Sequence, residues 1–387
     1  MSTPTDRNVF ILGAGASRDA GAPLIYDFLE RSRYFLYHPP AALDEHGIAQ
    51  FRRVFDFQHE MARSREKISV DLDNIEDLFG LVEMSCRLGQ TGKETRNSTV
   101  YLIVKTLELC LEPRRGRPHI GFRVDREHLS ELDGVSYAKR DSSDDPWFTI
   151  DMYEYLAMML GGWLDTPEHR RTREDVVITF NYDLLLDDAL MRVNLRPWYG
   201  PGIHDAAELQ PNSIHLLKLH GSANWAFCPK CKKPVVLYHK VTRLLGSLPQ
   251  PLCPECDNLR QPLLVPPSWD KTEYSDTMSP VWKLAVEKLK CATRICVVGY
   301  SIPESDAFFR HMITLALADN QQLERLIVVD KDTNIETKWE KLLDPVFCKR
   351  RFRFYGQAFQ LYLAGRSSCS DLSRGDYIRD NRLYGTI

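Results

Sequence analysis

The stretch at 8–23, NVFILGAGASRDAGAP, constrains the fold of this chain more than any other. Its apolar run at 9–12 has the length and β-branched content of a buried parallel strand, and it leads directly into GAGAS at 13–17. Glycines 13 and 15 let the backbone turn tightly and let a phosphate approach its N–H groups, and Ser17 is placed to cap a following helix. We therefore predict a strand–loop–helix unit that binds the diphosphate of a dinucleotide.

This glycine loop departs from the usual dinucleotide-binding fingerprint. That pattern has a third glycine three residues after the second, whereas the next glycine here is Gly21. Ala22 and Pro23 follow it, and the proline would end or bend the helix early. A tight strand-to-helix turn without a ligand is therefore the alternative interpretation of this stretch.

The charge and the cysteine content narrow the classes of function. The 50 Lys and Arg residues nearly balance the 53 Asp and Glu residues, for a net charge of −3, so no strong nucleic-acid or membrane footprint is expected. The sequence MSTPTDRN lacks the regions of a signal peptide, and no apolar run approaches the roughly 18 residues of a membrane helix, so we expect a cytoplasmic protein. In such a reducing compartment the ten cysteines are expected to be metal ligands or core residues rather than disulfides.

Two CxxC pairs form the most specific local pattern. Cys228 and Cys231 form the first pair, and Cys253 and Cys256 form the second after a loop of ribbon length. This spacing predicts a tetrahedral Zn²⁺ site in a small zinc ribbon at 225–262. Because four thiolates leave no coordination position for water, we expect the zinc to be structural. Four cysteines without a metal, or a redox pair, are the alternatives.

Four further apolar runs also end in polar residues. The run at 176–180 ends in Asn181-Tyr182-Asp183, 214–219 ends in His220-Gly221-Ser222, 295–298 leads into Gly299-Tyr300-Ser301, and 326–329 ends in Asp330. Open α/β sheets bind ligands at the carboxyl ends of their strands, so we expect these residues to lie together. A carboxylate at 330 would accept hydrogen bonds from both hydroxyls of a ribose. It would also repel a 2′-phosphate, which favours NAD over NADP as the ligand.

The pattern between the first two strands is helical. Residues 24–174 show helical spacing of apolar residues with few strand signals, and about 112–147 is rich in charge, Pro and Gly, which predicts a long loop. Asp73 or Asn74 is expected to cap a helix whose acidic residues form a solvated first turn. A lid or an oligomerisation module without chemistry of its own is the expected role of this segment.

We therefore predict an α/β fold. A Rossmann-like parallel sheet is formed by 1–23 and 175–366, with an inserted helical subdomain at 24–174 and a polar C-terminal tail at 367–387.

The order of these motifs resembles that of the sirtuin family. GAGAS is followed by TFNYD at 179–183, where sirtuins carry a T-x-N-x-D box, then by His220-Gly221, two CxxC pairs, Gly299-Tyr300-Ser301 and a strand-end acid. The resemblance covers roughly 7–23 and 175–366. The NIEDLF helix and the GYSIPESD loop look more like the bacterial sirtuin-like proteins that act as NAD-hydrolysing antiphage defence effectors.

This resemblance implies a sirtuin-like NAD⁺ hydrolase, with NAD⁺ as substrate and nicotinamide and ADP-ribose as products. Asn181 would orient the water or a ribose hydroxyl, His220 would act as general base, and Asp183 would line the nicotinamide pocket. The rest of the NAD site would be formed by Gly13, Ala14, Gly15, Ser17, Gly299, Ser301 and Asp330.

Three departures from the sirtuin deacetylases bear on the activity. GAPLIY at 21–26 replaces a G-I-P-D-F-R-like run, and Phe180 replaces the glutamine of the T-Q-N-x-D box. LLVPPSWDK at 263–271 replaces the strand that pairs with an acetyl-lysine peptide, and its two prolines cannot donate to an added strand. These changes argue against peptide deacylation. An NAD-dependent protein deacylase and a non-catalytic nucleotide-sensing or scaffold subunit stay as alternatives.

An effector that destroys NAD⁺ must be inactive until it is triggered. The chain carries no ATPase-like or sensor motif, so we expect a homo-oligomer that is controlled by a separate activating protein, such as an ATPase encoded nearby. The helical insertion is where its contacts are expected.

Overall fold

The structure is a computed structural model that describes residues 6–63, 70–111, 122–125, 147–163, 173–246, 252–266, 272–303 and 306–364. Most of the loop expected at about 112–147 and the polar tail at 367–387 lie outside these residues. Within the described ranges, no helix combines the length and the apolar character needed to cross a bilayer.

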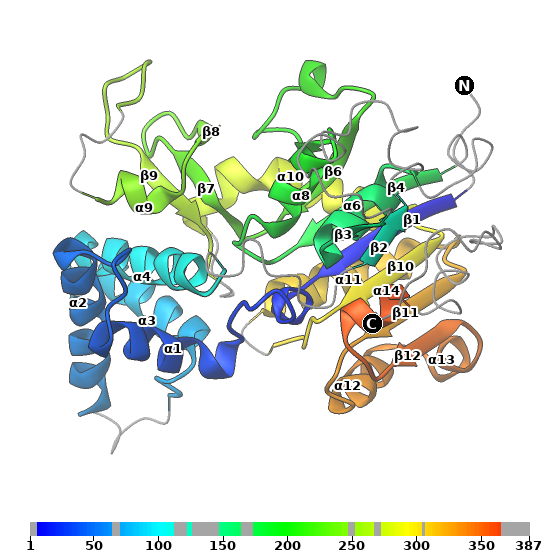
Figure 1. The fold of residues 1–387 in the computed structure, drawn as a ribbon, viewed down its shortest axis with the longest axis horizontal. Helices are drawn as coiled ribbons and strands as arrows, with labels where there is room; N and C mark the ends of the chain where they lie inside the picture. The colour runs from blue at the N-terminus through cyan, green and yellow to red at the C-terminus, as the bar shows by residue number, and fades with distance from the viewer. Residues whose placement is uncertain are drawn as a thin grey trace.

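Seven parallel strands form the central sheet, in the order β12-β11-β10-β1-β4-β6-β5 (Figure 1). In chain order they are β1 (Asp6–Leu12), β4 (Arg173–Thr179), β5 (Arg196–Trp198), β6 (Ser213–Lys218), β10 (Arg294–Val298), β11 (Arg325–Val329) and β12 (Phe352–Tyr355). Each apolar run that was expected to be a buried strand of the main sheet is found in it, and the pairings are parallel throughout. The Rossmann-like parallel sheet is confirmed.

The strand order reverses direction beside β1. From β1 the chain continues to β4, β6 and β5 on one side, and it later returns to place β10, β11 and β12 on the other side. A crevice forms at such a switch point, at the carboxyl ends of the strands. The topology therefore places the ends of β1 and β10 at the expected ligand site.

Helices and strands share one large apolar core. The helices that accompany the sheet are α6 (Met152–Leu160), α8 (Leu185–Arg192), α10 (Thr272–Lys290), α11 (Ala307–Asp319), α12 (Asn334–Leu342), α13 (Pro345–Arg351) and α14 (Phe359–Ala364). All five residues of β10 are buried, as in a strand with both faces covered. Helix α6 belongs to the range expected to be an insertion, yet its Leu156 and Ala157 pack within the core of the sheet.

Helices α1 (Ile25–Tyr37), α2 (Glu45–Ala62), α3 (Ile75–Arg87) and α4 (Lys93–Leu111) form a helical module with a second core. Phe51, Phe79 and Leu102 are buried at its centre. Asn74 is the residue that caps α3, because its side chain accepts from two N–H groups of the first turn. Figure 1 shows this module beside the sheet rather than within its layers.

A small antiparallel sheet carries the two CxxC pairs. Its strands are β7 (Gly221–Phe227), β8 (Pro234–Val236) and β9 (Gln261–Leu264), in the order β8-β7-β9, and the short helix α9 (Val241–Leu244) lies between β8 and β9 in the chain. Ala223, Val241 and Leu264 belong to the core of the helical module. The helical module and the small sheet therefore pack together through shared apolar residues.

Three elements differ from the sequence expectation. The antiparallel pair β2 (Phe122–Asp125) and β3 (Trp147–Ile150) lies within the range expected to have few strands, and each strand is too short to give a clear alternation pattern. Strand β5 is also only three residues long.

The loops after β1 and β10 contact each other through their backbones. A short 3₁₀ helix, η1 (Ala14–Ser17), follows β1, and the N–H of Gly15 donates to the carbonyl oxygen of Gly299 at 2.9 Å. Gly299 has a φ of +59°, and a Cβ there would lie 2.2 Å from the Ala16 nitrogen. Because the obstructing atoms are backbone atoms, neither loop can yield easily, and a glycine is required at this position.

We expect Gly299→Ala to lower the free energy of unfolding by about 3 kcal/mol, from the positive φ and the backbone clash together. Urea unfolding followed by circular dichroism measures this change. Gly80→Ala is the matched control, because Gly80 lies in α3 with open space around its Cβ position, and this change is expected to stabilise by up to about 1 kcal/mol. Equal stability of the two variants would contradict the close approach of the loops.

Candidate functional site

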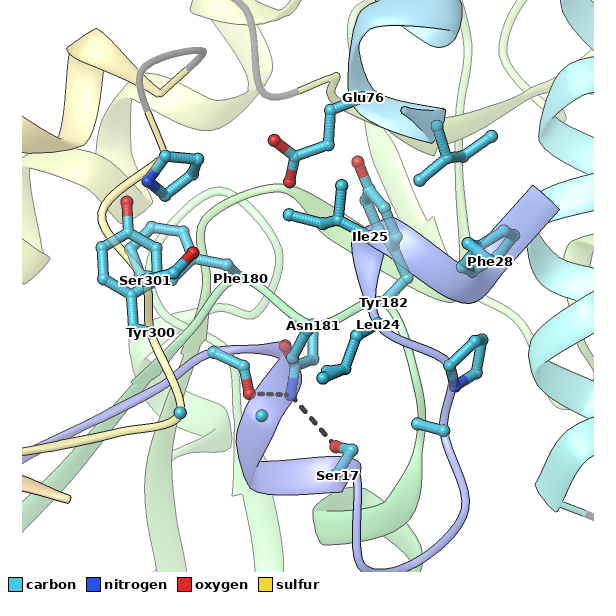
Figure 2. Close-up of a pocket in the computed structure, with 18 of the residues that line it drawn as sticks. Ser17, Leu24, Ile25, Phe28, Glu76, Phe180, Asn181, Tyr182, Tyr300 and Ser301 are labelled. Carbon is cyan, nitrogen blue, oxygen red and sulfur yellow. Dashed lines mark hydrogen bonds between the residues drawn. The ribbon is translucent and has the colours of Figure 1, made fainter. Parts of the chain in front are cut away.

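A cavity of about 310 Å³ lies at the carboxyl ends of β1, β4 and β10 (Figure 2). The loops that follow these strands form one wall, and residues of α1, α3 and α4 form the opposite wall. All ten residues expected at a nucleotide site line it: Gly13, Ala14, Gly15, Ser17, Asn181, Asp183, His220, Gly299, Ser301 and Asp330. The fold thus brings these residues together, and their individual roles stay predictions.

The glycine loop holds the neighbouring loop rather than presenting all of its N–H groups to the cavity. The N–H of Gly13 donates to the carbonyl oxygen of Val298 at 2.9 Å, and that of Gly15 donates to Gly299. These two groups, which the sequence interpretation offered to a phosphate, are already paired. The two glycines serve close approach of the chain, because a Cβ at either position would meet backbone atoms of the loop after β10.

Ser17 lies inside η1 instead of capping a following helix. It is fully buried, and its hydroxyl donates to Asp183 Oδ2 at 2.8 Å and lies 2.8 Å from the hydroxyl of Tyr153. The reason is that the chain turns away after η1, and the next helix, α1, begins only at Ile25. Ser17 therefore joins the glycine loop to the end of β4.

Asn181 is held at the end of β4 by its side-chain amide. Its Nδ2 donates to the carbonyl oxygen of Gly13 at 2.9 Å and to Ser17 Oγ at 3.1 Å (Figure 2). Because these two bonds use both protons of the amide nitrogen, the carbonyl oxygen Oδ1 is the group of this side chain left to act on a ligand.

Asp183 is buried beneath the cavity. Burial raises the pKa of its carboxyl, and the nearby Lys218 ammonium opposes this rise. Lys218 Nζ donates to the carbonyl oxygen of Asp183 at 2.6 Å and lies 3.1 Å from Asp187 Oδ2. Sequence analysis missed Lys218, although a lysine in the middle of an apolar strand pattern was a usable signal.

His220 lies in an aromatic and acidic surrounding that sequence analysis did not anticipate. It is 5% exposed, its Nε2 lies 3.7 Å from Asp306 Oδ2, and the ring of Phe180 meets its own ring edge-on. Phe180 also stacks on Tyr300 at 4.5 Å. Asp306 and Tyr300 both line the cavity. Their positions depend on the loop after β10, whose path only the folded chain defines.

Asp330 lies at the tip of β11, as expected, and lines the cavity. Burial raises the pKa of its carboxyl, and its Oδ1 accepts a hydrogen bond from the Asp332 N–H at 2.9 Å. Asp332 lines the same part of the cavity. A ribose diol suits this pair better than a further phosphate, because carboxylates accept hydroxyl protons and repel anions.

The helical module contributes the opposite wall of the cavity. Leu24, Ile25, Phe28 and Phe79 make this wall apolar, and Glu76 in the first turn of α3 also lines it. Figure 2 shows the Glu76 carboxyl directed toward the interior. Sequence analysis treated these acidic residues only as a solvated helix start. Helices expected to lack chemistry of their own thus form part of the candidate site.

The charged groups of the cavity are mostly acidic. Five carboxyl-bearing residues line it: Glu76, Asp183, Asp306, Asp330 and Asp332. Among the lining residues that the structure describes, none is a lysine or an arginine. Such a cavity attracts a cationic group, for example a pyridinium ring or an oxocarbenium-like sugar.

The four cysteines of the two CxxC pairs come together in the small sheet. Cys228, Cys231, Cys253 and Cys256 place their sulfur atoms within 4.8 Å of one another. Four thiol ligands at this spacing fit a tetrahedral zinc site. None of the four lines the cavity, so a metal here would act on the fold and not on a reacting molecule.

Comparisons with known proteins agree with the motif order. Residues 175–344 match the protein-family model described as a SIR2-like domain. This match supports the sirtuin family and an NAD-related function of the sirtuin type. A search of curated proteins returns no match.

Two solved structures are similar to this chain at low identity. One is a Sir2 variant with a deacetylated p53 peptide and 3′-O-acetyl ADP-ribose; it is 14% identical, with 96% of this chain and 94% of that chain covered and a TM-score of 0.38. The other is a mutant of a Sir2 homologue in complex with ADP-ribose; it is 13% identical, with 93% and 90% covered and a TM-score of 0.38. These likenesses are too weak to transfer a residue role or an activity.

We expect metal analysis of the purified protein to find zinc, and Cys253→Ser to remove it. Loss of the metal is expected to lower the free energy of unfolding by about 4 kcal/mol, because the small sheet loses the link between its two loops. Thermal unfolding with and without a chelator measures this. Cys291→Ser, at an exposed cysteine outside the cluster, is the control and should change neither zinc content nor stability. A protein without zinc and with unchanged stability would contradict a structural metal site.

Proposed function

We propose that this chain is an NAD⁺ nucleosidase that hydrolyses the bond between nicotinamide and ribose to give nicotinamide and ADP-ribose. One observation carries the proposal. Asn181, Asp183 and His220, which come from the ends of two neighbouring strands, line the same cavity as the glycine loop and Asp330. The match of 175–344 to a SIR2-like domain supports NAD⁺ as the ligand.

The reaction suits these residues. The C–N bond breaks with its electron pair moving to the pyridinium nitrogen, so nicotinamide leaves as a neutral molecule and no strong general acid is needed. The sugar gains positive charge, which the acidic cavity stabilises. The carbonyl oxygen of Asn181 orients the attacking water or a ribose hydroxyl, and His220 takes its proton.

The adenosine end of NAD⁺ is proposed to lie near β10 and β11. Asp330 would accept the hydroxyls of the adenosine ribose, with Gly299 and Ser301 beside it. A 2′-phosphate would be placed against Asp330 and Asp332 without a lining cation to balance it, so NAD is proposed as the substrate in preference to NADP.

Backbone pairing after β9 supports hydrolysis over peptide deacylation. The N–H of Val265 donates to the carbonyl oxygen of His220 at 2.8 Å, and the carbonyl oxygen of Val265 accepts from the hydroxyl of Tyr182 at 2.7 Å. Pro266, which follows, has no N–H group. An acyl-lysine peptide that binds by strand addition needs free backbone groups, and this segment offers few.

We expect the wild type to release nicotinamide from NAD⁺ without any peptide, and Asn181→Ala and His220→Ala to slow this by about 10²-fold or more. Chromatographic measurement of nicotinamide, with and without an acetylated peptide, distinguishes peptide-independent hydrolysis from peptide deacylation. His311→Ala, at an exposed histidine of α11, is the matched control and should keep wild-type activity.

Other outcomes of this assay select the alternatives. Release that requires the acetylated peptide would favour a protein deacylase. Binding of NAD⁺ without release under any condition would favour a nucleotide-sensing or scaffold subunit. Full activity of His220→Ala would contradict the role of His220 as base.

We further propose that the chain is an antiphage defence effector that depletes NAD⁺ when it is activated. The support is the resemblance of the NIEDLF and GYSIPESD segments to such proteins, and this role rests on the NAD⁺ hydrolysis proposed above. Such an enzyme must be silent at rest. We propose a homo-oligomer and a separate activating protein, such as an ATPase encoded nearby, that contacts the helical module.

We expect light scattering after size exclusion to give a mass that is a multiple of the 44.7 kDa chain. Addition of the neighbouring gene product should raise this mass and the rate of nicotinamide release together. A monomer whose mass and activity are unaffected by candidate partners would contradict this assembly.

A further inference from the structure

A buried carboxylate lies beside His220. Asp306 is 1% exposed, and its Oδ2 is 3.7 Å from His220 Nε2. Tyr300 donates its hydroxyl proton to the same Oδ2 at 2.9 Å. His220 follows β6, whereas Tyr300 and Asp306 both lie between β10 and α11, so the contact joins two distant parts of the chain.

Asp306 is held in place by a second contact. It is the N-cap of α11, a helix of 13 residues, and its Oδ1 accepts from the N–H of Phe309 at 3.3 Å. The positive end of a helix favours an ionised carboxylate at this position. Burial, and after it the Asp306 carboxylate, hold the pKa of Tyr300 well above its ordinary value, so the phenol keeps the proton that it donates.

We propose that Asp306 is a positioning residue for His220: its carboxylate orients the imidazole and stabilises the imidazolium that forms when His220 takes a proton. This inference rests on the proposed NAD⁺ hydrolysis for its catalytic meaning. In the hydrolysis, an O–H bond of the attacking water breaks and an N–H bond forms on the imidazole. The water oxygen forms the new bond to the sugar carbon, and the electron pair of the C–N bond leaves with nicotinamide.

The surroundings of His220 strengthen this effect. The ring of Phe180 lies 5.2 Å from the ring of His220, and that of Tyr182 lies 6.4 Å away. The titratable groups described around it are Tyr182, Tyr300 and Asp306, with Glu76 on the opposite wall of the cavity. Aromatic faces exclude water, and a charge interaction is larger where water is excluded. The Asp306 carboxylate lies within ion-pair distance of this ring, with its Oδ2 3.7 Å from His220 Nε2.

The first test does not depend on activity. Titration of the ¹⁵N-labelled histidines by NMR, with the His220 signal assigned from its loss in His220→Ala, gives the midpoint of the imidazole titration in the resting protein. Asp306→Asn is expected to lower the proton affinity of His220 about tenfold, because the opposite charge is removed. Asp306→Glu should restore part of it. Asp319→Asn, at the exposed end of the same helix, is the control and should leave the midpoint unchanged.

The second test measures the rate. A base works in its neutral form, so the rate of nicotinamide release rises with pH through the titration of His220. In Asp306→Asn we expect this rise at lower pH, and a plateau of kcat about 10²-fold lower with little change in KM. A variant with wild-type kcat and an unshifted profile would overturn the proposal.

Tyr300→Phe provides a second test of the same contact in case Asp306→Asn does not fold. It keeps the stack on Phe180 and removes only the hydroxyl that donates to Asp306. The carboxylate then acts more strongly on His220, so the proton affinity should rise, which is the opposite direction. An unchanged His220 titration in both Tyr300→Phe and folded Asp306→Asn would overturn the inference even if NAD⁺ is hydrolysed. If the two variants shift the His220 titration as expected but the wild type does not cleave NAD⁺, the contact is supported and the proposed function is rejected.

Discussion

The backbone of the loop after β1 lies directly against the backbone of the loop after β10, and the geometry of the site depends on this contact. Gly13, Gly15 and Gly299 leave no side chain between the loops, so the ends of the two strands approach within hydrogen-bond distance. Because the strand order reverses at this point, the contact forms the floor of the crevice. Asn181 then reaches across it to the carbonyl oxygen of Gly13.

Buried charges hold the adjacent strand ends in one arrangement. Lys218 is buried among apolar neighbours and is paired with Asp187, while it also donates to the carbonyl oxygen of Asp183. A buried charge is costly without such partners, so the ends of β4 and β6 have little freedom to shift relative to each other. His220 and Asp183 therefore enter the cavity from rigid positions, as a site for chemistry requires.

The cavity depends on two cores rather than one. Its sheet side belongs to the large apolar core, and its other side belongs to the core of α1–α4. A buried ion pair between Arg96 and Glu83, with Tyr274 hydrogen-bonded to both, joins the helical module to α10. Phe180 packs between Tyr300 and Phe309. This apolar contact supports the residues after β10 that line the cavity.

The amino-acid sequence by itself determined the long parallel strands, the polar residues at their ends and the four-cysteine cluster, because each depends on local periodicity or on short spacing. The short strands β2, β3 and β5 were not predicted from the sequence, because three or four residues are too few to show a clear alternation of apolar and polar side chains. Only the tertiary structure placed Glu76 and Asp306 at the cavity, brought Tyr300 into contact with Asp306, and used the Gly13 and Gly15 N–H groups within the fold. Those contacts join residues far apart in the chain, and their distances follow from packing between elements, which no local pattern records.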